Sequence, residues 1–136
     1  MYFVANWKMF GDLRALNSLD KVIKFSKTIR KNKFKIIYCP PSTLIRPFSK
    51  ILKTTQIGVG AQNCHHSYDF GANTGQVNSR MLKSVGAKYV IIGHSENRQL
   101  GEDDKLKIIT GIDGFLVGGA SQDSKKFIDI IKKTIN

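Results

Sequence analysis

Acidic residues are scarce in this chain. Its 136 residues include 10 Asp and Glu against 22 Lys and Arg, which gives a net charge of +12, and such a basic protein is a candidate for binding nucleic acid or acidic metabolites. The lysines, however, are scattered mostly over the outer faces of the expected helices, without interleaved aromatic residues or a nucleic-acid-binding motif. We therefore favour a solvated basic surface and expect no nucleic-acid partner, although such a surface attracts acidic metabolites.

Cysteine and long apolar runs are also scarce. Cys39 and Cys64 are the two cysteines, and neither stands in a CxxC or CxxH motif, so we expect two free thiols. No apolar run approaches the roughly 20 residues that cross a membrane. Asn6 and Lys8 interrupt the first apolar stretch and no small-residue cleavage site follows, which is unlike a signal peptide. The expectation is a cytoplasmic protein without a membrane partner.

Short apolar segments alternate with segments of helical spacing, in a chain whose length and 41% hydrophobic content fit a single domain, residues 1–136. Apolar strands separated by helices predict an α/β fold with a parallel sheet covered on both faces. The expected strands are 2–6, 35–39, 57–62, 89–93 and 115–117, and the expected helices are 16–29, 43–52, 79–85, 102–109 and 124–135.

Polar clusters follow four of the expected strands. Asn6 and Lys8 follow the first, "AQNCHH" ends the third, "GHSEN" (93–97) ends the fourth and "VGGAS" (117–121) ends the last. In parallel α/β folds, ligands bind beyond the carboxyl ends of the strands. One such cluster would be weak evidence, but four at the same edge predict a site.

The residue types in these clusters favour a phosphate ligand that also has a carbonyl group. Gly118 and Gly119 offer backbone N–H groups to an anion, and Lys8 adds a positive charge beside the amide of Asn6. His94 can donate to a carbonyl oxygen, with Glu96 or a backbone amide fixing its tautomer. A metal site is disfavoured, because the adjacent His65 and His66 would point apart on a strand and no further ligand has suitable spacing.

These motifs resemble those of the triosephosphate isomerase family. The resemblance rests on "VANWKM" in the first strand, "AQNCHHSYDFGANTG" after the third, "MLKSVGAKYVIIGHSE" around the fourth and "IDGFLVGGAS" around the last. It implies a (β/α)8 TIM barrel that interconverts dihydroxyacetone phosphate and glyceraldehyde 3-phosphate through an enediolate, in glycolysis and gluconeogenesis, without a cofactor.

The resemblance also implies roles for single residues. Asn6 and Lys8 match the substrate-binding pair, Lys8 is also a catalytic residue by this resemblance, and His94 matches the catalytic group that polarises the substrate carbonyl in this family. Gly118 and Gly119 match part of the phosphate loop. Thr74, at the tip of the 63–78 loop, matches a residue that reaches into the partner subunit of a homodimer.

The chain departs from the family pattern in its length. A complete barrel takes about 250 residues, and the matching blocks are those of strands one to four and the last, with a gap near residues 108–111. The expectation is a partial TIM barrel. Strands five to seven are missing, and with them the lid loop, a second glycine-rich phosphate loop and the catalytic glutamate; the two glutamates present, Glu96 and Glu102, match family positions that are not the base.

Three single positions also differ from the family pattern. Phe10, Gln76 and Asn97 stand where Asn, Glu and Arg are usual. The resemblance implies that this Glu and Arg form an ion pair near the dimer interface, and because both charges are lost together neither is left unpaired, so we expect a weakened contact rather than a destroyed one.

The sequence thus supports two main hypotheses. The first is a triose-phosphate isomerase, whose turnover would depend on His94. The second is a catalytically inactive remnant, without the base, that binds phosphate or a partner subunit weakly. A basic nucleic-acid binder is a third, less favoured reading.

Overall fold

The strands form a single parallel sheet. The computed structural model describes residues 1–28, 34–94, 114–117 and 119–135. Within them, five strands lie in the order β4-β3-β2-β1-β5, and all neighbouring pairs are parallel. The prediction of a parallel α/β fold is confirmed. The strands are β1 (Tyr2–Asn6), β2 (Lys35–Cys39), β3 (Gly58–Ala61), β4 (Tyr89–Val90) and β5 (Gly114–Val117).

The last strand lies beside the first. Tyr2 pairs with Gly114 and Val4 with Leu116 in parallel register. The first and last strands are neighbours in a closed (β/α)8 barrel, so β5 takes the place that the resemblance assigns to it. Among the described strands, β4 and β5 are the two outer ones, and the sheet is therefore an open part of a barrel.

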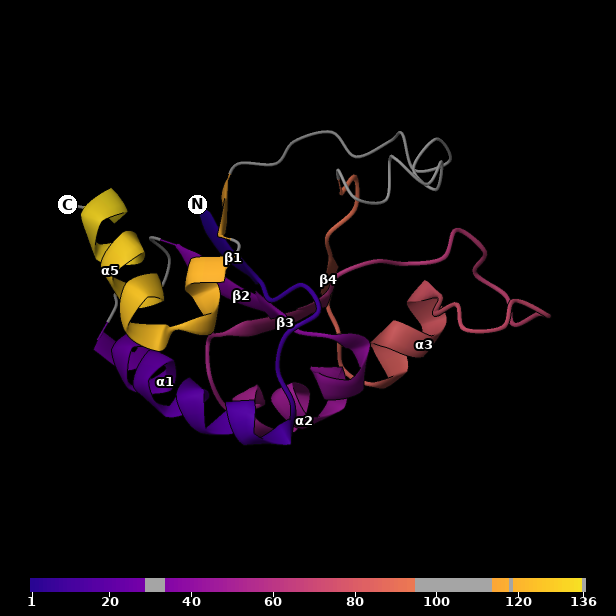
Figure 1. The fold of residues 1–136 in the computed structure, drawn as a ribbon, viewed down its shortest axis with the longest axis horizontal. Coiled ribbons are helices and arrows are strands. Elements are labelled where there is room, and N and C mark those ends of the chain that lie inside the picture. Colours follow the sequence, from indigo (N-terminus) through magenta and orange to yellow (C-terminus); the bar gives the residue numbers. More distant parts are fainter. Residues whose placement is uncertain (29–33, 95–113, 118, 136) are drawn as a thin grey trace.

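The helices lie on one side of this sheet. Figure 1 shows α1, α2, α3 and α5 gathered along the same side of the strands. The expectation of a sheet covered on both faces is therefore wrong for the described residues. Right-handed crossovers that all turn in one direction place every helix on the same face, as in a barrel. The helices are η1 (Leu13–Ser18), α1 (Leu19–Thr28), α2 (Ser42–Leu52), α3 (Ser79–Ser84), η2 (Gly119–Gln122) and α5 (Ser124–Ile135), of which η1 and η2 are 3₁₀ helices.

Two expected elements differ from the structure by more than one residue at an end, and four others (43–52, 57–62, 79–85 and 115–117) differ by a single residue at one or both ends. The helix expected from residue 16 begins as the 3₁₀ turn η1 and becomes α-helical at Leu19. The strand expected over 89–93 ends at Val90, although Ile91 still donates to the carbonyl of Ala61 at 2.9 Å. As an outer strand, β4 has one described neighbour to hold it straight, and Val90 is 38% exposed. The helix expected over 102–109 lies outside the described residues.

The core lies between the sheet and its helices. Phe3 and Ala5 of β1 and Tyr38 of β2 face the helices and are buried, as the alternation of a strand requires. Tyr38 contacts Phe48 of α2 and Phe127 of α5, with ring centroids 5.9 and 5.6 Å apart. Each such aromatic side chain contributes roughly 1.5–3 kcal/mol by burial, so this cluster holds α2 and α5 against β2. No described helix is long and apolar enough to cross a membrane.

Candidate functional site

The site lies at the carboxyl edge of the sheet, where β1, β3 and β4 end. Because the strands are parallel, the residues that follow Asn6, Ala61 and Val90 emerge at the same edge. Asn6, Lys8, Gln62 and His94 are the polar residues placed there. We call these four residues the rim.

Asn6 and Lys8 form a closed turn rather than a continued strand. The side-chain Oδ1 of Asn6 accepts a hydrogen bond of 2.9 Å from the backbone N–H of Lys8. Lys8 has a φ of +53°, so the extended backbone of β1, which ends at Asn6, does not continue through Lys8. A lysine in this left-handed region costs of order 1–3 kcal/mol. Asn6 is 4% exposed and Lys8 is exposed, which leaves the Lys8 side chain accessible to an anion.

Gln62 joins three strand ends. Its Nε2 donates to the carbonyl of Lys8 at 2.8 Å and to the carbonyl of Cys39, the last residue of β2, at 2.9 Å. The backbone carbonyl oxygen of Gln62 contacts Nε2 of His94. This one residue therefore connects Lys8 to His94. The sequence does not single out Gln62, because the expected strand 57–62 includes it and its hydrogen-bond partners come from other strands.

His94 follows β4 and presents a donor to the rim. A peptide carbonyl can only accept, so the contact of His94 Nε2 with the Gln62 carbonyl makes Nε2 the protonated nitrogen of the ring. That N–H is the group that can polarise a carbonyl oxygen. In this structure it already engages a carbonyl, so a ligand carbonyl would have to replace that of Gln62.

The turn after β5 lies beside the end of β1. Trp7 Nε1 donates to the carbonyl of Ser121 at 3.2 Å, and the Ser121 hydroxyl donates to the carbonyl of Asn6 at 3.5 Å. Gly119 begins η2, so it is in the segment that approaches Asn6. The 3₁₀ turn η2, which contains Gly119, directly precedes α5. Gly118 and Glu96 lie outside the described residues.

The remaining candidate residues lie apart from the rim. Thr74 is exposed in the loop that joins β3 to α3, which projects away from the sheet in Figure 1. His65 and His66 were expected to point apart, but their ring centroids are 4.2 Å apart, because they lie in a loop rather than a strand. No group of three potential ligands among the described residues could hold a metal ion.

Both cysteines are free thiols, as predicted. Cys39 is buried, and this burial raises the pKa of its thiol to about 12. Burial also raises the pKa of Cys64, whose Sγ donates to the carbonyl of His65. A thiol that stays protonated is a poor nucleophile, so neither cysteine suits a catalytic role at the rim.

Comparison with known proteins gives a consistent result. The profile of the family described as Triosephosphate isomerase matches residues 1–109. A triosephosphate isomerase of Wolbachia pipientis is 38% identical over 128 residues, which is 90% of this chain and 51% of that protein. One from Alkaliphilus oremlandii is 39% identical over 94 residues, or 69% of this chain and 37% of that protein.

A solved structure supports the same relationship. The crystal structure of triosephosphate isomerase from Bartonella henselae superposes with a TM-score of 0.68 at 30% sequence identity, covering 98% of this chain and 58% of the other. This chain thus spans between 37% and 51% of the length of the curated relatives compared here.

Proposed function

This chain belongs to the triosephosphate isomerase family, and from that premise we propose that its rim binds a phosphorylated triose and interconverts dihydroxyacetone phosphate and glyceraldehyde 3-phosphate. The reaction would serve glycolysis and gluconeogenesis in the cytoplasm and need no cofactor. The observation that supports this proposal most strongly is the connection through Gln62, which holds the Lys8 turn and the His94 ring at one edge.

Each rim residue has a role in this proposal. Lys8 supplies the positive charge for the phosphate and for the developing enediolate, and Asn6 holds the Lys8 turn while its amide lies next to the ligand. His94 donates its Nε2 proton toward the substrate carbonyl in place of the Gln62 carbonyl, and so stabilises the negative charge that forms on that oxygen. Gly118 and Gly119 offer backbone N–H groups to the phosphate, by family resemblance.

The carbon-bound proton has no assigned base in this chain. A base must lie within hydrogen-bond reach of the proton that it removes, and neither Glu96 nor Glu102 stands at the family position for it. This observation favours a second candidate function, in which the rim binds a phosphorylated triose without turnover. The two candidates share the binding step and differ in the chemistry.

Two measurements on the purified chain test these candidates. A phosphoglycolate-type analogue should raise its melting temperature, and His94→Gln and Lys8→Met should both reduce that shift. A coupled assay should show isomerisation above a heat-denatured control, abolished by His94→Gln. Binding without turnover would leave only the second candidate function. The absence of a thermal shift at every analogue concentration would exclude both candidates.

We also propose a homodimer formed through the 63–78 loop. Tyr68 and Phe70 in this loop are each 65% exposed, and Thr74 would reach the partner's rim by family resemblance. Exposed aromatic side chains of this kind are typical of contact surfaces. Sedimentation velocity should show a dimer that dissociates when Tyr68 and Phe70 are both replaced by Ser, and a wild-type chain that sediments as a monomer at high concentration would refute the dimer.

A further inference from the structure

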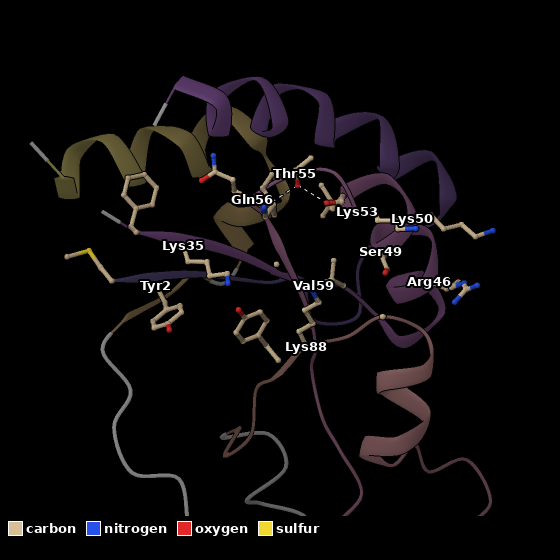
Figure 2. A pocket seen from close by; sticks show the side chains of 17 residues that line it. Tyr2, Lys35, Arg46, Ser49, Lys50, Lys53, Thr55, Gln56, Val59 and Lys88 are labelled. Carbon is tan, nitrogen blue, oxygen red and sulfur yellow. Dashed lines mark hydrogen bonds between the residues drawn. The ribbon is translucent and has the colours of Figure 1, made fainter. Parts of the chain in front are cut away.

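A cavity lies at the opposite edge of the sheet from the rim. Its volume is about 950 Å³, and its lining includes the first residue of each of four strands, namely Tyr2, Lys35, Gly58 and Tyr89. The rim instead follows the last residues of these strands. Figure 2 shows Tyr2 and Lys35 at one side of the cavity and Ser49, Lys50 and Arg46 at the other. The family resemblance assigns no role to these residues.

The cavity is strongly basic. Of the residues that line it, five are cationic and none is acidic, and among the described residues no carboxylate forms an ion pair with these cations. We call this cavity the basic hollow. Its cations are Lys35, Arg46, Lys50, Lys53 and Lys88.

Three of these cations come from a single helix face. Arg46 and Lys50 in α2 and Lys53 just after it stand at positions i, i+4 and i+7, which lie on one face of a helix. All three are exposed. Like charges held close together repel one another, and a multivalent anion between them relieves that repulsion. The fold also brings Lys35 and Lys88, which lie outside α2 in the sequence, to the same cavity.

Aromatic rings lie at the other side of the basic hollow. Tyr2 is 41% exposed, and the Lys35 ammonium lies 5.3 Å from the ring centroid of Tyr89. A Cβ atom at Gly58 would come within 2.7 Å of the Tyr89 ring, so the glycine is what lets this ring lie against the sheet. The ring is therefore held in place at the side of the hollow opposite the cations of α2.

We propose that the basic hollow binds a nucleoside triphosphate. The phosphates would lie against Arg46, Lys50 and Lys53, and the base would stack against Tyr2, beside the Lys35–Tyr89 pair. The volume is at the upper end of the roughly 300–1,000 Å³ typical of small-molecule sites. A ligand of this class combines the multivalent charge and the flat ring that the two sides of the hollow provide.

Calorimetric titration of the wild-type chain with ATP, tripolyphosphate and adenosine, without divalent metal, tests the ligand class. ATP should bind most tightly, tripolyphosphate more weakly and adenosine not measurably. Raising the ionic strength from about 0.01 M to about 0.15 M should weaken ATP binding, because the Debye length falls from about 30 Å to about 8 Å. Equal affinity for ATP and tripolyphosphate, tighter binding of a uridine oligonucleotide, or no ATP binding would overturn the proposal.

A pair of matched variants tests the location. The triple variant Arg46→Gln, Lys50→Gln, Lys53→Gln removes three cations from the basic hollow, and Lys21→Gln, Lys24→Gln, Lys27→Gln removes three exposed cations from α1. Because each exposed charge contact contributes only modestly, the first variant should lose about tenfold in ATP affinity and the second less than about twofold. Equal losses would mean that general charge attracts ATP and that the hollow is not a site.

This test is independent of the proposed function. A phosphoglycolate-type analogue should leave the ATP affinity of the chain unchanged, because the rim and the basic hollow lie at opposite edges. Competition between the two ligands would place ATP at the rim and refute the separate site.

Discussion

Gln62 is the residue on which the geometry of the rim depends most directly. Its side-chain amide reaches the carbonyls of Lys8 and Cys39, and its backbone reaches His94. The bond to the Lys8 carbonyl helps to hold that residue at its φ of +53°. Gln62 therefore acts as a positioning residue for the Lys8 charge.

We predict that Gln62→Met weakens binding of a phosphoglycolate-type analogue about tenfold. Methionine keeps the length of the side chain but loses two hydrogen bonds, each worth about 0.5–1.5 kcal/mol, so the Lys8 turn relaxes. Calorimetry measures the affinity. Gln56→Met, at an exposed glutamine of the opposite edge, is the matched control and should bind like wild type. An unchanged affinity of Gln62→Met would show that the bond to Lys8 has no positioning role.

Tyr38 and Cys39 make the stability of the fold sensitive to alkaline pH. Burial raises the pKa of the Tyr38 hydroxyl above its ordinary value of 10.0 and that of the Cys39 thiol from 9.0 to about 12. Above these ordinary values the unfolded chain releases protons that the folded chain retains. The free energy of unfolding is therefore unaffected by the titration of these two groups below about pH 9. It falls by about 1.4 kcal/mol per pH unit for each group once the pH exceeds that group's ordinary pKa, 9.0 for Cys39 and 10.0 for Tyr38.

We predict that Tyr38→Phe loses less stability than wild type as the pH rises above 10.0. Phenylalanine has no hydroxyl to ionise in the unfolded state, whereas the titration of the surface lysines is common to both proteins. Urea unfolding followed by the fluorescence of Trp7, the single tryptophan, gives the free energy of unfolding at each pH. Parallel pH profiles of the two proteins would contradict this account.

Several elements could be predicted from sequence almost to the residue. The strand Lys35–Cys39 and the helix Ser124–Ile135 have the predicted bounds. Pro40 ends the strand, and Phe127 and Ile131 give the helix an unbroken apolar face. The start of the first helix could not be predicted, since 3₁₀ and α-helical turns space their apolar residues similarly. There, the Asp12 side chain accepts from the N–H of Arg14 and starts η1.

The helix α5 depends on a cap at its first turn. The Oδ1 of Asp123 accepts from the backbone N–H groups of Lys125 and Lys126, and these bonds lower the pKa of its carboxyl group. Phe127 and Ile131 then insert into the core with no exposed surface. The cap fixes the turn from which these two side chains reach the sheet.

We predict that Asp123→Ala lowers the free energy of unfolding by about 1 kcal/mol, the usual cost of losing such a cap. Asp123→Asn, which keeps an oxygen acceptor, should lose less. Chemical unfolding of the three proteins measures both changes. Equal losses for Ala and Asn would mean that the negative charge, and not the hydrogen bonds, stabilises the turn.

At the scale of the whole molecule, the parallel sheet and the edge that holds the rim could be predicted from sequence, because polar residues follow apolar strands. The placement of β5 beside β1 came from family resemblance. The one-sided cover of helices follows from the barrel that the family resemblance implied, whereas the role of Gln62 and the basic hollow could not be predicted. Each depends on which elements become neighbours, as when the cations of α2 and Tyr89 of β4 line one cavity, and no local pattern reports such an arrangement.

The central claim is that Lys8 and His94 bind one ligand together at the rim. An NMR titration of the labelled chain with a phosphoglycolate-type analogue tests it most directly. We predict that the Lys8 amide, the Gln62 side-chain amide and the His94 ring signals shift together with a single dissociation constant, while the amides of Lys50 and Lys53 stay in place. Different dissociation constants for Lys8 and His94, or shifts confined to the basic hollow, would contradict the claim.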